Sequence, residues 1–342
     1  MRLPIKRLLI TTLLSVLLLL VAAWFGGRWY LAGSVLDADG RAVLAGLDAP
    51  VEVAFDARGI PRIRAATDAD ALRALGWLHA AERGLQMELM RAVARGELST
   101  LVGAAALDSD RLHQRFGFAR RIALDPPELD PEVHELLIAY VDGINQRLEA
   151  GDLPPGLVLL GGQPRPWTVP DVLTLAYYQT WYPTTLVQRL AEAWRAAGGA
   201  GPPEMAEWLD RLPAWGLPTI PAQRMTEASN TWVVGPARSA SGSALHASDP
   251  HLDITMAPGL WYAAGLHSEQ TLDVVGVTAP GIPFVAMGHN GRIAFAFTVA
   301  PVDLFEFYRF ARLDGEADLL RGPEGPVEVY EHASRLRVAG AD

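Results

Sequence analysis

The sequence contains no cysteine and only one lysine, Lys6. Without cysteine the protein can form no disulfide, use no thiolate nucleophile and hold no zinc or iron–sulfur centre through sulfur. Positive charge is scarce as well, since 29 lysines and arginines stand against 39 aspartates and glutamates, which gives a formal net charge of −10. So acidic a chain is not expected to bind nucleic acid.

Three common catalytic or binding motifs are also missing. The sequence has no glycine-rich phosphate loop, no Gly-x-Ser-x-Gly elbow and no His-Glu-x-x-His motif. Nucleotide binding, an α/β-hydrolase and a standard zinc peptidase therefore have no support. What is present is a globular composition, 50% hydrophobic and 20% charged over 342 residues, which suits two domains or one large composite fold.

The N-terminus carries an export signal. Three positive residues, the last being Arg7, precede an apolar run over 8–26, and no charge follows until Arg28. As a helix, this run would span about 28 Å, just enough to cross a hydrocarbon core. We predict a signal anchor or transmembrane segment over 1–30, with the body on the periplasmic side of the inner membrane. A cleaved signal peptide, which would leave the protein in the periplasm, is the alternative.

Helical patterns dominate residues 31–197. Thr67 is a suitable N-cap for a long amphipathic helix that stops near Gly96, and we read Met87 on this helix as core. A short hairpin precedes it, and two further helices are predicted at 131–148 and from 169 to about 197.

Glycine and proline then mark a linker over 198–228, and residues 229–342 change to short strand-like runs. Helices first and strands second indicate an α+β fold rather than alternating βαβ units.

Two local patterns suggest chemistry. Asp249, His251 and Asp253 alternate, so on a strand their side chains would share one face and suit a metal-dependent hydrolase, although neighbouring prolines favour a loop. The second pattern is Ala228-Ser229, at the start of the first strand after the linker. If that bond were cut, Ser229 would supply both a hydroxyl nucleophile and an α-amine whose pKa, about 7.7–8.0, suits a general base.

Several motifs in a fixed order carry a family resemblance. They are RGIPRI at 58–63, ALGWLHAAER at 74–83 with QME at 86–88, SN-x-W at 229–232, DPHL at 249–252 and GHNG at 288–291. Together they resemble the penicillin acylase (penicillin amidase) family of N-terminal-nucleophile hydrolases. The histidine at 251 makes the sequence more similar to the acyl-homoserine-lactone and cephalosporin acylase branch.

The resemblance implies an αββα four-layer core and a zymogen that cleaves itself before Ser229. The linker 198–228 would be the excised spacer and 229–342 the start of a β chain. Ser229 would then form an acyl-enzyme and hydrolyse a linear or side-chain amide, with His251 and Val299 as further catalytic residues. Implied substrates are β-lactams or N-acyl amines, which links the protein to antibiotic metabolism or quorum sensing.

Further positions follow from the same resemblance. Leu252 and Met287 match residues that line the acyl pocket, and Asp303 with Glu306 match carboxylates of a structural calcium site. No catalytic cofactor is implied. Family chains are longer, so we expect an N-terminal fragment in which the β chain is incomplete. The non-enzymatic alternative is a catalytically silent, membrane-tethered binding module.

Overall fold

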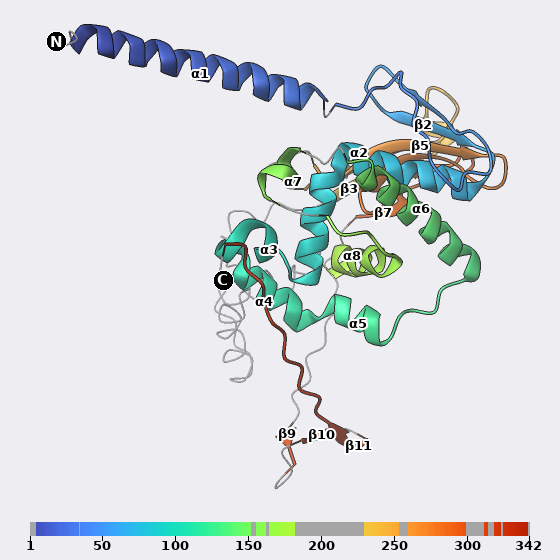
Figure 1. Cartoon of the computed structure of the whole chain (residues 1–342). Coiled ribbons are helices and arrows are strands. Elements are labelled where there is room, and N and C mark those ends of the chain that lie inside the picture. The colour runs from blue at the N-terminus through green and yellow to red at the C-terminus, as the bar shows by residue number, and fades with distance from the viewer. Residues whose placement is uncertain are drawn as a thin grey trace.

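The computed structural model describes residues 5–33, 35–151, 155–161, 164–181, 229–252, 259–298, 311–313, 318–322 and 324–340. Helix α1, Ile5–Gly33, extends away from the rest of the chain (Figure 1). Its segment Leu9–Ala32 is long and apolar enough to cross a membrane and has no buried residue in its most apolar window. The predicted N-terminal apolar helix is therefore confirmed, and a signal sequence would have the same properties.

Two long helices form the main helical layer. Helix α2, Asp68–Arg95, begins at Thr67, whose side chain accepts a hydrogen bond from the Asp70 amide, and it ends at Gly96 in the left-handed conformation. Both ends are where the sequence predicted them. Helix α6, Pro131–Glu149, packs against α2.

Glycine allows these two helices to approach closely. A methyl group on Gly76 would collide with the backbone oxygen of Tyr140, and one on Gly143 would collide with that of Arg73. The remaining helical segments are α3 Ser99–Val102, η1 Gly103–Ala106, α4 Leu107–Phe116, α5 Phe118–Leu124, α7 Pro155–Leu159 and α8 Val169–Trp181.

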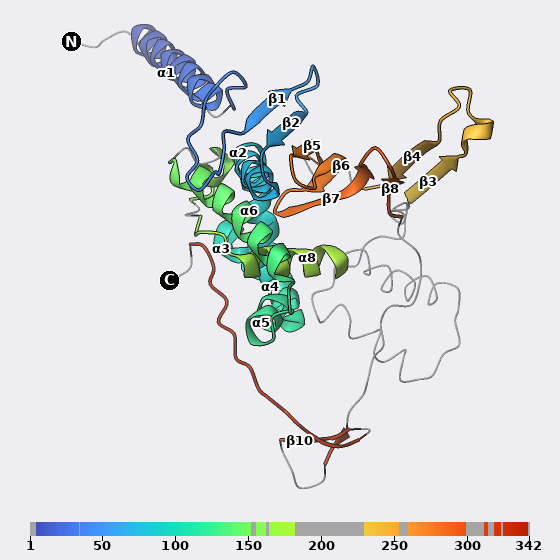
Figure 2. The same ribbon diagram turned by 90° about the vertical axis from the view of Figure 1, so that its right-hand side faces the viewer.

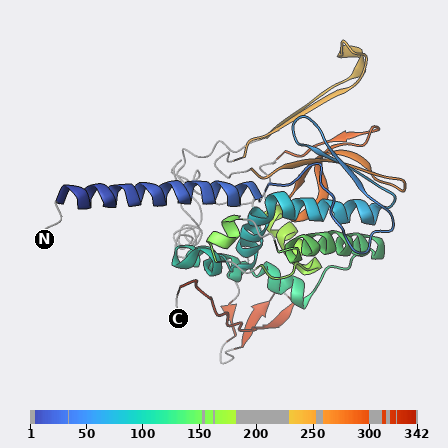
Figure 3. The ribbon, with the colours of Figure 1, turned by 45° about the horizontal axis from the view of Figure 1, so that its top comes forward.

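A six-stranded sheet lies on this helical layer (Figures 1 and 3). Its order is β1-β2-β5-β6-β7-β8, and only the β2–β5 contact is parallel. The strands are β1 Glu52–Phe55, β2 Pro61–Ala65, β5 Tyr262–Ser268, β6 Asp273–Ala279, β7 Ile282–His289 and β8 Ala294–Phe295. Strands from both sides of the predicted linker thus share one sheet, which makes a single composite body.

The core lies between the sheet and α2, α6 and α8. It contains Ile63, Leu75, Met87, Ile144 and Leu266, all at most 3% exposed. Met87 is therefore a core residue, as predicted.

A hydrogen-bonded chain crosses this core through His79, which is fully buried. The Gly281 amide donates to the Tyr140 hydroxyl at 3.0 Å, and that hydroxyl lies 2.7 Å from His79 Nδ1. On the other side, His79 Nε2 lies 2.9 Å from the hydroxyl of Thr278, which donates to the Tyr262 carbonyl. Because the Thr278 proton is already used, Nε2 must donate, and in a neutral ring Nδ1 then accepts from the Tyr140 hydroxyl. Burial, with a smaller effect of Arg83, lowers the pKa of His79 to about 3.

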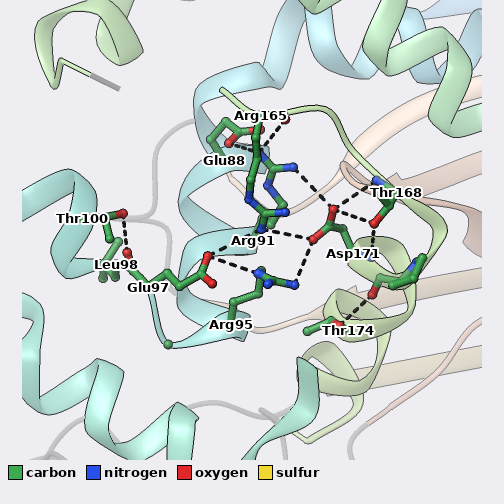
Figure 4. Close-up of polar contacts among 12 residues, drawn as sticks. Glu88, Arg91, Arg95, Glu97, Leu98, Thr100, Arg165, Thr168, Asp171 and Thr174 are labelled. Carbon is green, nitrogen blue, oxygen red and sulfur yellow. Dashed lines mark hydrogen bonds and ion pairs between the residues drawn. The ribbon is translucent and has the colours of Figure 1, made fainter. Parts of the chain in front are cut away.

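A second buried network joins α2 to the start of α8 (Figure 4). Asp171 is completely buried and contacts three guanidinium groups at 3.3 to 3.6 Å; these belong to Arg91, Arg95 and Arg165. The Asp171 carboxylate also accepts bonds from the Thr168 amide and hydroxyl. Burying these charges costs free energy, and this cost is offset only because each charge contacts oppositely charged or hydrogen-bonding partners. The network therefore forms only when α2 and α8 pack in this arrangement.

Two smaller sheets stand outside this body. Strands β3 Ser229–Val234 and β4 Leu245–Pro250 form a hairpin that projects from the six-stranded sheet (Figures 2 and 3), with a 3₁₀ turn η5 at Pro236–Arg238. Strands β9 Ala311–Arg312, β10 Leu319–Gly322 and β11 Gly325–Glu328 form the other. From there an extended segment returns to α3, where the Ala339 amide donates to the Ser99 carbonyl.

The predicted α+β content agrees with this architecture. The described residues form one helical layer on one large sheet. The second sheet layer and the second helical layer of the predicted αββα core are not found among these residues. The linker at 198–228 and the predicted continuation of α8 toward residue 197 lie outside the described ranges.

Candidate active site

Ser229 is the first residue of β3. It lies opposite Pro250, the last residue of β4, in the antiparallel register, and Asn230 lies opposite Asp249. His251 directly follows Pro250. Two residues that are 22 positions apart, 251 − 229, are therefore brought to the same end of one hairpin.

The side chain of His251 has two polar neighbours. Its Nε2 lies 2.9 Å from Oδ2 of Asp249 and 3.3 Å from the amide group of Asn230. The imidazole is 35% exposed and the carboxylate 60%, so both remain accessible to solvent. Ser229 and the imidazole–carboxylate pair thus lie at the same end of the hairpin, and these residue types suit nucleophilic attack and proton transfer.

The predicted pocket residues lie close to this end of the hairpin. Leu252 is the next residue after His251 and is 38% exposed. Met287 lies on β7, and its sulfur is 3.7 Å from the hydroxyl of Ser248 on β4. This contact ties the hairpin to the large sheet beside the Ser229–Pro250 pair.

Four predicted site residues lie outside the described ranges. They are the oxyanion residue Val299, the calcium candidates Asp303 and Glu306, and Asp253 of the alternative metal site. Among the residues that are described, no three metal-binding side chains converge. The described part of the alternating pattern is therefore an Asp249–His251 pair.

The sequence reasoning missed the direct contact between Asp249 and His251. The alternating spacing of the two residues suggests a metal site as one alternative, whereas the same spacing also lets a carboxylate orient an imidazole. It also missed the interior pair of His79 and Tyr140, for which no local signal exists because the two residues are 61 positions apart.

A cavity of about 370 Å³ lies elsewhere, between α4, α5 and the extended segment 330–336. Its lining includes Arg111, Arg115, Arg120 and His332. None of the predicted site residues contributes to it.

Comparison with known proteins gives a consistent result. The penicillin amidase family model matches residues 50–342. Penicillin acylase 2 proenzyme from Pseudomonas sp. (strain SE83) is 32% identical over 311 residues, which cover 79% of this chain and 38% of the relative. Acyl-homoserine lactone acylase QuiP from Pseudomonas aeruginosa is 27% identical over 318 residues, covering 84% of this chain and 37% of the relative. The chain thus spans well under half the length of these relatives.

A solved structure is also similar. A thermostable penicillin G acylase from Alcaligenes faecalis is 23% identical and has a TM-score of 0.34, with 50% of this chain and 95% of that chain covered. A score of this size carries no argument about the fold.

Proposed function

The chain belongs to the penicillin amidase family, and from this membership we propose that the protein is an amidohydrolase that cleaves a linear amide into a carboxylate and an amine. One observation carries the proposal. Ser229, in the position expected for the nucleophile, lies in register beside the residue that precedes His251.

In the proposed reaction, the precursor first cleaves the Ala228–Ser229 bond. The freed α-amine then takes the proton of the Ser229 hydroxyl, whose oxygen attacks the substrate carbonyl and forms an acyl-enzyme after the amine leaves. Water hydrolyses this ester. The backbone amides of His251 and Val299 are proposed to stabilise the oxyanion, a contribution of about 3–4 kcal/mol per donor in related chemistry.

The substrate is proposed to be an N-acyl amine with an alkyl acyl group, or a β-lactam amide. Leu252 and Met287 are aliphatic, so a pocket that they line would accept an alkyl chain as readily as a ring. The names of the similar proteins, a penicillin acylase and an acyl-homoserine lactone acylase, support both substrate classes. Rates measured over a series of acyl-chain lengths on a chromogenic anilide would choose between them.

The cellular setting and the calcium site are further parts of the proposal. Helix α1 would anchor the protein in the inner membrane with its body in the periplasm, or be removed as a signal. Asp303 and Glu306 would hold a structural Ca²⁺, which suits hard oxygen ligands. Chelation should then lower the thermal midpoint without abolishing the reaction, whereas loss of activity that zinc restores would favour a metal-dependent hydrolase.

The decisive experiment is mass spectrometry of the whole protein expressed from its gene. We expect a fragment that starts at Ser229, and we expect a Ser229→Ala variant to remain uncleaved and inactive. Ser239→Ala, a change of a partly buried serine directly after the 3₁₀ turn of the same hairpin, is the matched control and should mature normally. A folded wild-type protein that stays in one piece and hydrolyses no amide would support the binding-module alternative; an intact but active protein would overturn the mechanism.

A further inference from the structure

The contact between Asp249 and His251 has a consequence for the chemistry of the site. A carboxylate offers only lone pairs, so the ring nitrogen that lies 2.9 Å from it must carry a hydrogen. That nitrogen is Nε2. In the opposite tautomer, a lone pair on Nε2 would face the lone pairs of Asp249 Oδ2. Of the two neutral tautomers, the pair therefore favours the one with the hydrogen on Nε2 and the lone pair on Nδ1.

We propose that Asp249 is a positioning residue that fixes the ring and the tautomer of His251, so that Nδ1 is the nitrogen available as acceptor for the reacting groups at Ser229. The inference rests on the proposed function of the same site and adds to it. It assigns a task to a carboxylate that would otherwise be interpreted as a surface charge or a metal ligand.

The contact to Asn230 is compatible with this tautomer. Its amide group lies 3.3 Å from the same Nε2, which cannot accept a bond while it carries the hydrogen. Turning the amide by half a rotation, a choice that fixes only which atom is oxygen, gives Nε2–H a second acceptor. Both neighbours of Nε2 then favour the same protonation of the ring.

The backbone explains why the Asp249 carboxylate lies beside the His251 ring. Residues two apart on a strand project to the same side, which places the Asp249 carboxylate beside the His251 ring. Pro250 lies between them and restricts its own φ to about −65°. It is also the register partner of Ser229. Ser229, on β3, and the Asp249–His251 pair, at the end of β4, thus lie at the same end of the hairpin.

A second aspartate–histidine pair serves as a comparison for Asp249 and His251. His267 and Asp273 face each other across β5 and β6 at 3.5 Å, with side chains 54% and 77% exposed. This pair lies on the six-stranded sheet, whereas Ser229 belongs to the separate two-stranded sheet of β3 and β4. Asp273→Asn removes the same charge from the same kind of pair and is the matched control.

The test uses the whole protein and two readouts. The first is the ¹⁵N NMR spectrum of labelled histidine in the Ser229→Ala background, with the His251 signal assigned by its loss in His251→Gln. We expect His251 to be protonated on Nε2, and Asp249→Ala to give a mixture of tautomers. Asp249→Asn keeps an acceptor oxygen and should retain the Nε2–H form. Because this readout requires neither cleavage nor turnover, it gives a result even if a variant does not mature.

The second readout is steady-state kinetics on the matured enzyme. Asp249→Ala should lower kcat by about 10- to 100-fold with KM changed less than about twofold, and Asp249→Asn should lose less. Asp273→Asn should leave both constants unchanged. An unchanged tautomer and an unchanged kcat in Asp249→Ala would overturn the inference. A wild-type protein that neither matures nor hydrolyses amides would instead overturn the proposed function, whatever the NMR spectrum shows.

Discussion

The buried body and the exposed hairpin use the same residue type in opposite ways. His79, in the body, has no exposed surface, and every hydrogen-bonding atom of its ring is used to join α2, α6 and the sheet. The side chain of His251, at the end of the hairpin, is 35% exposed, and its contacts within the described part of the chain are made by Nε2. Burial converts a titratable group into a structural one, whereas partial exposure beside a carboxylate leaves it able to act on a substrate.

The same contrast holds for the charges. In the body, Asp171 is enclosed by arginines, and breaking such a network leaves charges uncompensated in a medium of low polarity. On the hairpin, charges are solvated. Changes in the body should therefore alter stability, and changes at the hairpin end should alter chemistry.

The largest effect on stability is expected from Asp171→Ala. The change leaves three guanidinium groups without their shared partner, and we expect the free energy of unfolding to fall by about 3–5 kcal/mol in urea denaturation. The control is Asp108→Ala, which removes an exposed Asp108–Arg111 pair and should cost less than about 1 kcal/mol. Similar losses for the two variants would contradict the distinction between body and surface.

The next effect is a loss of stability on acidification, caused by His79. Its folded pKa, about 3, is below the ordinary value of 6.5, so below pH 6.5 the unfolded chain binds a proton that the folded chain does not. Stability should therefore fall as the pH falls from 6.5 toward 3, with about 2 kcal/mol lost by pH 5. His113, whose pKa burial also lowers, acts in the same direction.

His79→Gln provides the check on this assignment. Glutamine has no titratable ring, so its unfolding free energy should be lower at pH 7 but should depend less on pH between 7 and 5. A variant with the wild-type pH dependence would show that His79 titrates normally in the folded protein.

A smaller effect is expected from Thr67→Ala at the start of α2. The threonine hydroxyl accepts the Asp70 amide at 3.1 Å, and removing an N-cap typically costs about 1 kcal/mol. Thermal unfolding followed by circular dichroism would measure it. Thr67→Ser, which keeps the acceptor, should be close to wild type, and an equal loss in both variants would argue against capping as the cause.

The smallest effect should come from His246→Gln on the hairpin. His246 contacts the Thr231 hydroxyl at 2.9 Å, but the pair is solvated, and His246 lies three residues before Asp249 on the same strand. We expect less than about 0.5 kcal/mol of stability and no more than a twofold change in kcat/KM. A large loss of activity would extend the site along the hairpin and weaken the assignment of its end as the reactive part.

Local chemistry made several features predictable from the sequence. Thr67 and Gly96 mark the ends of α2 because capping is decided by residues within one turn. The strand at Ser229 and the apolar N-terminal helix follow from short-range patterns as well. The order of motifs also placed Ser229 and His251 in a family before any contact was known, and the family is confirmed.

Long-range pairing was decided by tertiary structure alone. No pattern near residue 62 specifies a parallel partner at residue 265, yet this pairing joins the segments before and after the predicted linker in one sheet. The neutral state of His79 depends on Tyr140 and Thr278, which come from two other elements. The role of Asp249 depends on which group lies next to it, a hydrogen-bond donor or a metal. Sequence fixes which groups are available, but burial and the direction of each hydrogen bond arise only when distant segments pack, because desolvation depends on everything that surrounds an atom.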